Sequence, residues 1–275
     1  MFFLPKFKIE FKRNCKIWFR QTKDNEESKM LVRITNCCHM GCNHCMVDAT
    51  PDGEHMSLET FMDVIKFTKD HGDFFLMLSG GEPLDHPYFF EFANIAKKFL
   101  PFCLILSNGM FLNDEDLRER VLALNMMVQI TNDPRYYPHT IPYVEHPCIT
   151  YEDTLHIISP FGRAVLNKIP VTQQFPMCFN LRSASRALRS FADAILMLRN
   201  KFKMCNPSIN VDGTISAGES PFCYKIGTVK FTDEELLENI LTMKCNKCGL
   251  ERNLSSTYKN AIGLSDENLQ STCGV

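Results

Sequence analysis

Cysteine is the residue type whose number and spacing suggest chemistry in this chain. Among 275 residues there are 13 cysteines, and three of them form the pattern Cys38-x3-Cys42-x2-Cys45. Three thiolates on one tight loop can hold three irons of a 4Fe–4S cluster and leave the fourth iron open for a reactant. A zinc knuckle is the alternative, although zinc sites favour four ligands in two close pairs. Cys37 does not fit the spacing, so we exclude it from the set.

A second motif, Leu78-Ser-Gly-Gly-Glu-Pro-Leu84, follows an apolar stretch. Gly80 and Gly81 allow the backbone to approach a ligand closely, and Glu82, followed by Pro83, offers a carboxylate to an ammonium group. An ordinary glycine turn between a strand and a helix is the alternative interpretation.

Together the two motifs resemble those of the radical SAM superfamily, in which the open iron chelates the amino and carboxylate groups of S-adenosylmethionine. The resemblance implies that Gly80–Pro83 binds the cofactor's amino group, with Glu82 as its acidic partner. It also implies that a flavodoxin- or ferredoxin-type reductant supplies an electron. Cleavage then gives a 5′-deoxyadenosyl radical that removes a hydrogen atom from the substrate. His44 stands at a position that is usually aromatic in the family.

Three further segments are expected to line the cofactor pocket by the same resemblance. Ser107 and Asn108 follow the third predicted strand, and Thr131 with Asp133 follows the fourth. Arg163 follows the fifth predicted strand and is expected to pair with the cofactor's carboxylate. An Asn-Gly turn and an ordinary surface arginine remain the alternatives for the first and the last of these segments.

A second group of cysteines lies near the C-terminus. Cys205 and Cys223 flank a predicted β-hairpin, and Cys245-x2-Cys248 follows. This spacing resembles the twitch module, a shortened SPASM domain, and implies a second 4Fe–4S cluster. No further cysteine occurs until Cys273, so a third cluster is not expected. Zinc is again the alternative.

The elements that must position these motifs alternate between strands and helices. This rhythm predicts an α/β fold built from parallel βα units, a partial (β/α)6 TIM-type barrel with its site at the C-terminal ends of the strands. The predicted strands are Leu31–Asn36, Phe74–Leu78, Leu104–Leu106, Met127–Thr131, His156–Ser159 and Met177–Asn180.

Capping residues mark the helices between these strands. Ser57 is predicted to cap a helix whose apolar face carries Leu58, Phe61, Met62 and Ile65, and Asn113 is predicted to cap a later one. The stretch 133–150 has no helical period, and its tyrosines and histidines are expected to help wall the active site.

We therefore divide the chain into an N-terminal extension (1–30), the barrel (31–204), and a small β-hairpin-plus-helix module with a polar tail (205–275). An Asp212-Gly213 turn predicts the hairpin over Ser208–Ile215. Thr232 and Glu235 predict a capping box at the start of the following helix, with Phe231 packing on Leu236.

Composition narrows the functional classes. The formal net charge is −2 and the apolar fraction is 45%, so the charge balance gives no support to a nucleic-acid partner, and no stretch is long enough for a membrane span. The absence of a signal-peptide pattern leads us to expect a cytoplasmic protein with reduced thiols.

Three functions remain open on the sequence alone. The first is a two-electron oxidation or cross-linking of a peptide or small-molecule substrate. The second is a redox-neutral epimerisation in which Cys148 or Cys178 returns hydrogen. The third is a non-catalytic iron–sulfur protein for electron transfer or binding.

Overall fold

The computed structural model describes residues 29–71, 75–100, 103–131, 135–152, 158, 161–170, 190–191 and 207–242. Several predictions concern residues outside these ranges and are not tested by the structure. They are the extension up to residue 28, the strand Met177–Asn180, Asp133, and the cysteines Cys178, Cys205, Cys245, Cys248 and Cys273.

The described elements alternate between strands and helices, as the sequence predicts. The strands are β1 (Lys29–Thr35), β2 (Phe75–Gly80), β3 (Cys103–Ser107), β4 (Met127–Thr131), β5 (Ile149–Glu152), β6 (Ser208–Ile209), β7 (Thr214–Ser216) and β8 (Lys225–Thr228). The helices are α2 (Leu58–Asp70), α3 (Phe89–Phe99), α4 (Glu115–Ala123), α5 (Arg163–Leu166) and α7 (Asp233–Thr242), with 3-10 turns η1 (Pro83–Asp85) and η2 (Met110–Asn113). No described helix has the length and apolar composition of a membrane span.

All eight described strands belong to one sheet, in the order β5-β4-β3-β2-β1-β6-β7-β8. Strands β1 to β5 are parallel, and β6 pairs in parallel with the other edge of β1. Strands β7 and β8 continue the sheet in antiparallel fashion. The mostly parallel sheet agrees with the predicted α/β class, and its open edges among the described strands agree with a partial barrel.

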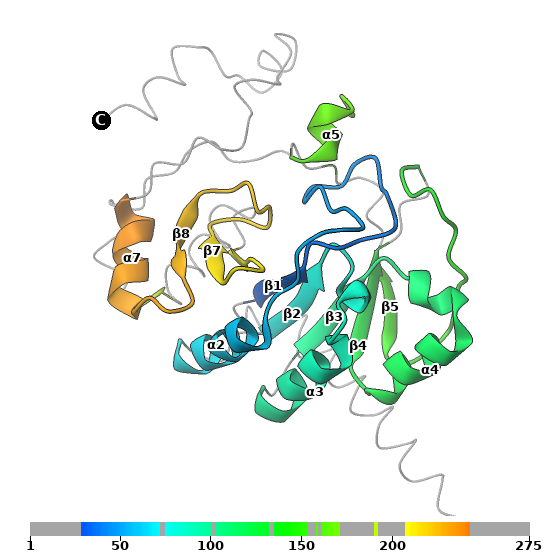
Figure 1. The fold of residues 1–275 in the computed structure, drawn as a ribbon, viewed down its shortest axis with the longest axis horizontal. Helices are drawn as coiled ribbons and strands as arrows, with labels where there is room; N and C mark the ends of the chain where they lie inside the picture. Colours follow the sequence, from blue (N-terminus) through cyan, green and yellow to red (C-terminus); the bar gives the residue numbers. More distant parts are fainter. Residues whose placement is uncertain are drawn as a thin grey trace, which may run out of the picture.

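The two faces of the sheet bury different sets of side chains. Helices α2, α3 and α4 cover one face (Figure 1), where Val32, Leu76 and Ile105 belong to the main core. Alternate residues such as Leu31 and Met77 form a smaller apolar layer on the opposite face. This alternation follows from the two-residue period of a strand, and it leaves Arg33 on the same face as Leu31.

Helix boundaries were predicted partly correctly. Ser57 caps α2, since its side chain accepts from the Thr60 N–H, and Phe61 and Ile65 are buried. Leu58 and Met62 are exposed instead, because the buried stripe of α2 continues through Val64 and Phe67.

The predicted cap of α4 was one residue too early. Asp114, not Asn113, caps this helix and accepts from the Leu117 N–H. Asn113 ends the 3-10 turn η2 that precedes it.

The fifth strand is a correction to the sequence analysis. It is Ile149–Glu152, which pairs in parallel with β4, and it lies at the end of the stretch predicted to be irregular. Of the predicted strand His156–Ser159 only Ile158 is described, and it is not in a strand.

The hairpin forms as predicted, but it is not a separate body. Strands β6 and β7 pair around the Asp212-Gly213 turn, and Thr232 and Glu235 make both capping-box hydrogen bonds. However, β6 also pairs with β1, and Ile209, Ile215 and Leu236 lie in the main core. The segment 207–242 thus shares its core with the rest of the sheet.

Candidate active site

The three cysteines of the first motif lie on the loop that follows β1. Cys38 and Cys42 are buried and Cys45 is partly exposed. Two sulfurs accept backbone hydrogen bonds at 3.5 Å: Cys38 Sγ from the Met40 N–H and Cys45 Sγ from the Ala49 N–H. Hydrogen bonds to the sulfurs are one of the features that set the reduction potential of an iron–sulfur cluster.

The electrostatics of this loop call for a positive partner. Burial raises the pKa of Cys38 to about 11, and burial together with the neighbouring thiols Cys45 and Cys38 raises the pKa of Cys42 to about 12. Without a bound cation these thiols stay protonated at neutral pH. Metal binding deprotonates thiols, so the buried set fits a metal centre.

The second motif lies directly against this loop. The Gly81 N–H donates to Thr35 O (2.7 Å) and the Glu82 N–H donates to Cys37 O (2.8 Å). A Cβ on Gly80 or Gly81 would stand 2.2 Å from a carbonyl oxygen of Thr35 or Cys37. The two glycines are therefore needed for the approach of two loops to each other, in addition to any approach of a ligand.

Glu82 carries the central carboxylate of the site. Its Oε1 accepts from Ser107 Oγ (2.9 Å) and the Leu84 N–H (3.3 Å), and its Oε2 accepts from the Asn108 N–H (2.7 Å). Burial raises its pKa to about 7, although these hydrogen bonds act in the opposite direction.

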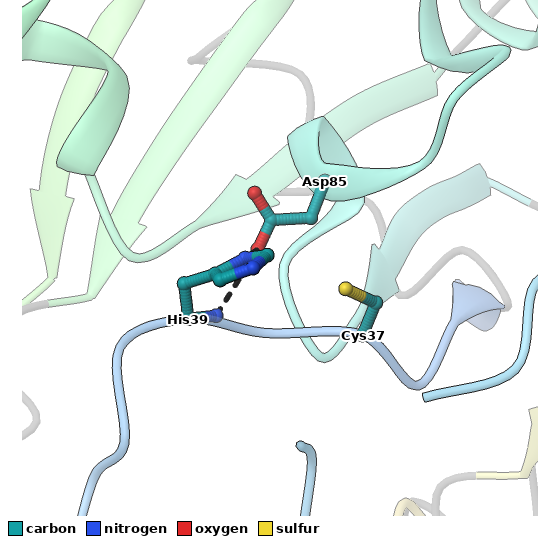
Figure 2. A group of neighbouring side chains, drawn as sticks. All are labelled: Cys37, His39 and Asp85. Carbon is teal, nitrogen blue, oxygen red and sulfur yellow. Dashed lines mark hydrogen bonds and ion pairs between the residues drawn. The ribbon is translucent and has the colours of Figure 1, made fainter. Parts of the chain in front are cut away.

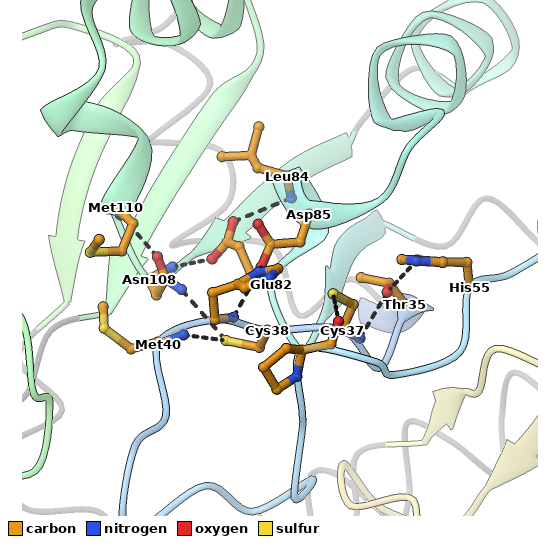
Figure 3. A network of polar contacts seen from close by, with 12 residues as sticks. Thr35, Cys37, Cys38, Met40, His55, Glu82, Leu84, Asp85, Asn108 and Met110 are labelled. Carbon is orange, nitrogen blue, oxygen red and sulfur yellow. Dashed lines mark hydrogen bonds and ion pairs between the residues drawn. The ribbon is translucent and has the colours of Figure 1, made fainter.

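Asn108 connects the carboxylate to the cysteine loop. Its backbone N–H donates to Glu82, and its Nδ2 donates to Cys38 Sγ at 3.8 Å (Figure 3). Asn108 Oδ1 in turn accepts from the Met110 N–H. The ends of β1, β2 and β3 thereby bring a thiol, a carboxylate and an amide together at one edge of the sheet.

Arg163 lies elsewhere than predicted. It begins the short helix α5 instead of following a strand. Its Nε donates to Cys42 O (2.8 Å), and its Nη1 donates to Ala49 O (2.7 Å) and Asp48 Oδ1 (3.3 Å). Its backbone N–H also donates to Cys45 O (2.9 Å). These contacts fasten α5 to the cysteine loop, which sequence reasoning missed because the partners are more than 100 residues apart.

Two aromatic rings from the stretch 133–150 contact the cysteine loop. His44 stacks against Tyr137 and lies tilted against Tyr136. The Tyr137 hydroxyl is 3.2 Å from Thr131 Oγ1, and burial raises the pKa of Tyr137 well above its usual value. Tyr143, by contrast, is exposed.

Cys37, excluded by its spacing, lies beside His39 and Asp85, and the ligand atoms of these three residues lie within 4.8 Å of one another. Cys37 Sγ donates to Pro51 O at 3.0 Å. Nearby, Asp85 Oδ2 lies 3.0 Å from His39 Nδ1 and accepts from the His39 N–H (Figure 2). This group joins the cysteine loop to η1, on the chain segment that carries Glu82.

Three further cysteines are described, of which Cys103 is buried at the start of β3. Cys223 is partly exposed, and its turn contacts the first loop through Ser220 Oγ, which donates to Met46 O at 3.4 Å. Cys148 is fully buried in the apolar layer of Leu31 and Met127. The strand pairing places this apolar layer level with Leu31. Leu31 is four residues, or about 13 Å, before the end of β1 at Thr35.

Comparisons with known proteins agree with this geometry. Residues 32–157 match the model of the radical SAM superfamily, a range that contains the cysteine loop, Glu82, Asn108 and Thr131. A search of the curated proteins found no match.

Solved structures resemble the chain more distantly. BtrN in complex with AdoMet and 2-DOIA is 16% identical, with 83% of this chain and 87% of that chain covered and a TM-score of 0.49. Native anSMEcpe with bound AdoMet and Cp18Cys peptide is 12% identical, with 80% of this chain and 81% of that chain covered and a TM-score of 0.39. Streptococcus suis SuiB bound to S-adenosylmethionine is 11% identical, with 93% of this chain and 75% of that chain covered and a TM-score of 0.41. The match of residues 32–157, somewhat less than half of the chain, shows that this part of the chain is similar to the radical SAM superfamily.

Proposed function

We propose that the protein is a radical SAM enzyme of the oxidoreductase type. In this proposal Cys38, Cys42 and Cys45 hold a 4Fe–4S cluster, which, once reduced by a flavodoxin- or ferredoxin-type carrier, supplies the electron that cleaves S-adenosylmethionine to a 5′-deoxyadenosyl radical. The substrate, a peptide or a small molecule, loses a hydrogen atom to that radical.

One observation carries the proposal: the Glu82 carboxylate and the Cys38 thiol share Asn108 as a hydrogen-bond donor. An ammonium group bound between them would donate a charge-assisted hydrogen bond to the buried carboxylate. Arg163 and Asn108 would hold the cysteine loop while the cofactor binds. Tyr137 and His44 would keep water from that side of the loop.

We further propose an auxiliary 4Fe–4S cluster on Cys205, Cys223, Cys245 and Cys248, in a twitch-like module within 205–275. Four thiolates would ligate every iron, so this cluster would not bind substrate directly. The described part of this module, residues 207–242, shares the main core of the sheet, so a metal staple is not its sole source of burial. Cys223 also lies on a turn that contacts the first cysteine loop.

These points favour an electron-accepting role for the auxiliary cluster. After hydrogen abstraction, the substrate would lose one electron and one proton, and the product would lack two hydrogens. A cross-link formed with loss of two hydrogens has the same electron balance.

The alternative, a redox-neutral epimerisation, needs a hydrogen donor within contact of the substrate radical. Cys148 is a poor candidate because it lies in the apolar layer about 13 Å before the strand ends. Cys178 lies outside the described residues and keeps this alternative open. A non-catalytic iron–sulfur protein would have no use for a buried carboxylate beside an open iron.

The first test is 5′-deoxyadenosine release by anaerobically reconstituted protein with dithionite and S-adenosylmethionine. Formation in the wild type, and its loss when the three loop cysteines are changed to alanine, is expected. Release at the wild-type rate in that triple variant would refute the proposal.

The second test applies once a substrate is found, and it is product analysis in deuterated solvent. The oxidation predicts a product that lacks two hydrogens and carries no solvent deuterium at the reacting carbon. An isomeric product with one solvent deuterium would select the epimerase alternative.

A further inference from the structure

Cys37, His39 and Asp85 form a group of possible metal ligands that the proposed function does not use. Their ligand atoms, a sulfur, an imidazole nitrogen and a carboxylate oxygen, all lie within 4.8 Å of one another. Cys37 and His39 belong to the loop after β1, whereas Asp85 ends η1 on a separate segment (Figure 2). Within the described part of the chain, no other three side chains of these types converge in this way.

Backbone hydrogen bonds fix the positions from which these side chains reach one another. The Cys37 N–H donates to Thr35 Oγ1 (2.9 Å), and the Cys37 carbonyl accepts from the Glu82 N–H (2.8 Å). The Asp85 N–H in turn donates to Glu82 O (3.0 Å). Because the two segments are already fastened to each other, little further ordering is needed when an ion binds between their side chains.

The carboxylate and the imidazole are oriented toward each other and remain open to solvent. Asp85 Oδ2 lies 3.0 Å from His39 Nδ1 and accepts from the His39 backbone N–H at 3.2 Å. A backbone hydrogen bond of this kind orients a carboxylate that binds a metal. The side chains of His39 and Asp85 are 68% and 27% exposed, so an ion can enter from solvent and keep a water ligand.

The thiol of Cys37 completes the group from its buried side. Cys37 Sγ donates to Pro51 O at 3.0 Å, so its proton is directed at a carbonyl and not at His39 or Asp85. Metal binding would release this proton to solvent and leave a thiolate. The thiolate and the Asp85 carboxylate would then carry two negative charges beside a neutral imidazole, which balances a divalent cation.

The mixture of ligand types indicates which divalent cation fits. Zinc accepts cysteine sulfur at about 2.3 Å, histidine nitrogen at about 2.0–2.1 Å and carboxylate oxygen at about 2.0–2.2 Å. In a tetrahedron these bonds place the ligand atoms about 3.3–3.8 Å apart. The 3.0 Å between His39 and Asp85 and the 4.8 Å limit for the whole group lie on either side of this range. Calcium and magnesium prefer oxygen ligands.

We propose that Cys37, His39 and Asp85 bind a single Zn²⁺ ion, with water as its fourth ligand. The ion is separate from the iron–sulfur chemistry of the proposed function, and the inference does not depend on that function. Bound there, zinc would tie the cysteine loop to η1, on the segment that carries Glu82. It would thus add a metal link to the backbone hydrogen bonds between the two segments.

The experiment is a zinc titration of the anaerobically reconstituted holoenzyme, dialysed against buffers of fixed free Zn²⁺. Elemental analysis then gives zinc and iron per chain. The wild type should take up about one zinc that Asp85→Asn and His39→Ala lack until free Zn²⁺ is raised about tenfold or more, since even groups behind the ligands have effects of this size. Asp116→Asn, which changes an exposed carboxylate on α4, should titrate like the wild type.

Zinc K-edge X-ray absorption of the loaded wild type identifies the ligands. One sulfur at about 2.3 Å with three nitrogen or oxygen ligands is expected. Three or four sulfurs would place the zinc on other cysteines and overturn the proposal, as would an absence of zinc uptake or wild-type titration of both ligand variants. Should His39→Ala lose iron, Asp85→Asn decides, because Asp85 lies outside the cysteine loop. Release of 5′-deoxyadenosine tests the proposed function separately.

Discussion

Glu82 gives the sharpest test of the cofactor site, because both its contacts and its ionisation are defined. Its carboxylate is buried, accepts three hydrogen bonds, and has a pKa raised to about 7 by burial. If it receives the ammonium group of S-adenosylmethionine, replacing it by glutamine should remove a charge-assisted hydrogen bond. Such a bond is worth about 1.5–3 kcal/mol, or roughly ten- to a hundredfold in affinity.

Because the pKa of Glu82 is raised, the loss of cofactor affinity caused by Glu82→Gln should increase with pH. With a pKa of about 7, Glu82 is about one-tenth ionised at pH 6 and about nine-tenths ionised at pH 8. Since the ammonium group binds the ionised form, the affinity lost through Glu82→Gln should be about tenfold larger at pH 8 than at pH 6. The cofactor's own amine titrates equally with both proteins, so the ratio of the two Kd values isolates Glu82.

Anaerobic isothermal titration calorimetry at the two pH values measures this ratio. Glu115→Gln is the matched control, because Glu115 is exposed on α4 and pairs with Arg118 there. Glutamine in place of Glu82 can still accept from the Asn108 N–H and donate to Ser107 Oγ, so iron content should not change. Equal Kd values for Glu82→Gln and wild type at pH 8 would show that Gly80–Pro83 is an ordinary glycine turn and not a cofactor-binding segment.

Three other predictions follow from the site and its supports. Reconstituted wild-type protein should hold about eight irons, and alanine at Cys38, Cys42 and Cys45 should leave about four, as measured by iron and sulfide analysis. Arg163→Met should speed the loss of the first cluster to a chelator by tenfold or more, since it removes charge-assisted hydrogen bonds to the loop; an unchanged rate would mean that α5 does not support the loop. Thr232→Ala should lower the free energy of unfolding by about 1 kcal/mol in urea titrations through loss of its cap, without changing the iron content.

The core of the site was predictable from sequence because its parts follow the ends of neighbouring parallel strands. Cys38 follows β1, Glu82 follows β2 and Asn108 follows β3, and these ends necessarily meet at one edge of the sheet. The Thr232 capping box was predictable for a similar reason, since both partners lie within one turn of helix.

What sequence reasoning missed depends on contacts distant in the chain. Arg163 holds carbonyl oxygens of a loop 114 to 121 residues earlier, and nothing in its local sequence distinguishes it from a surface arginine. Strand β5 was missed because it is only four residues long and follows a proline-rich stretch, so pairing with β4 defines it more than its own pattern does. In the sequence Arg33 is one polar residue within a strand. Its hydrogen-bond partners, Ser208 and Asn210, lie more than 170 residues later in the chain, so they could not be predicted.

The position of β1 brings two cysteine-bearing segments together. On one edge β1 pairs with β2, whose end carries Glu82, and on the other edge it pairs with β6, whose hairpin partner β7 is followed by the turn carrying Cys223. That turn contacts the cysteine loop, since Ser220 Oγ donates to Met46 O, although 185 residues separate Cys38 from Cys223 in the chain. Arg33 belongs to β1 itself and donates to Ser208 on β6 and to Asn210 just after it. A buried guanidinium therefore fastens the hairpin to the strand that precedes the cysteine loop, so the two segments are held together by side-chain as well as backbone hydrogen bonds.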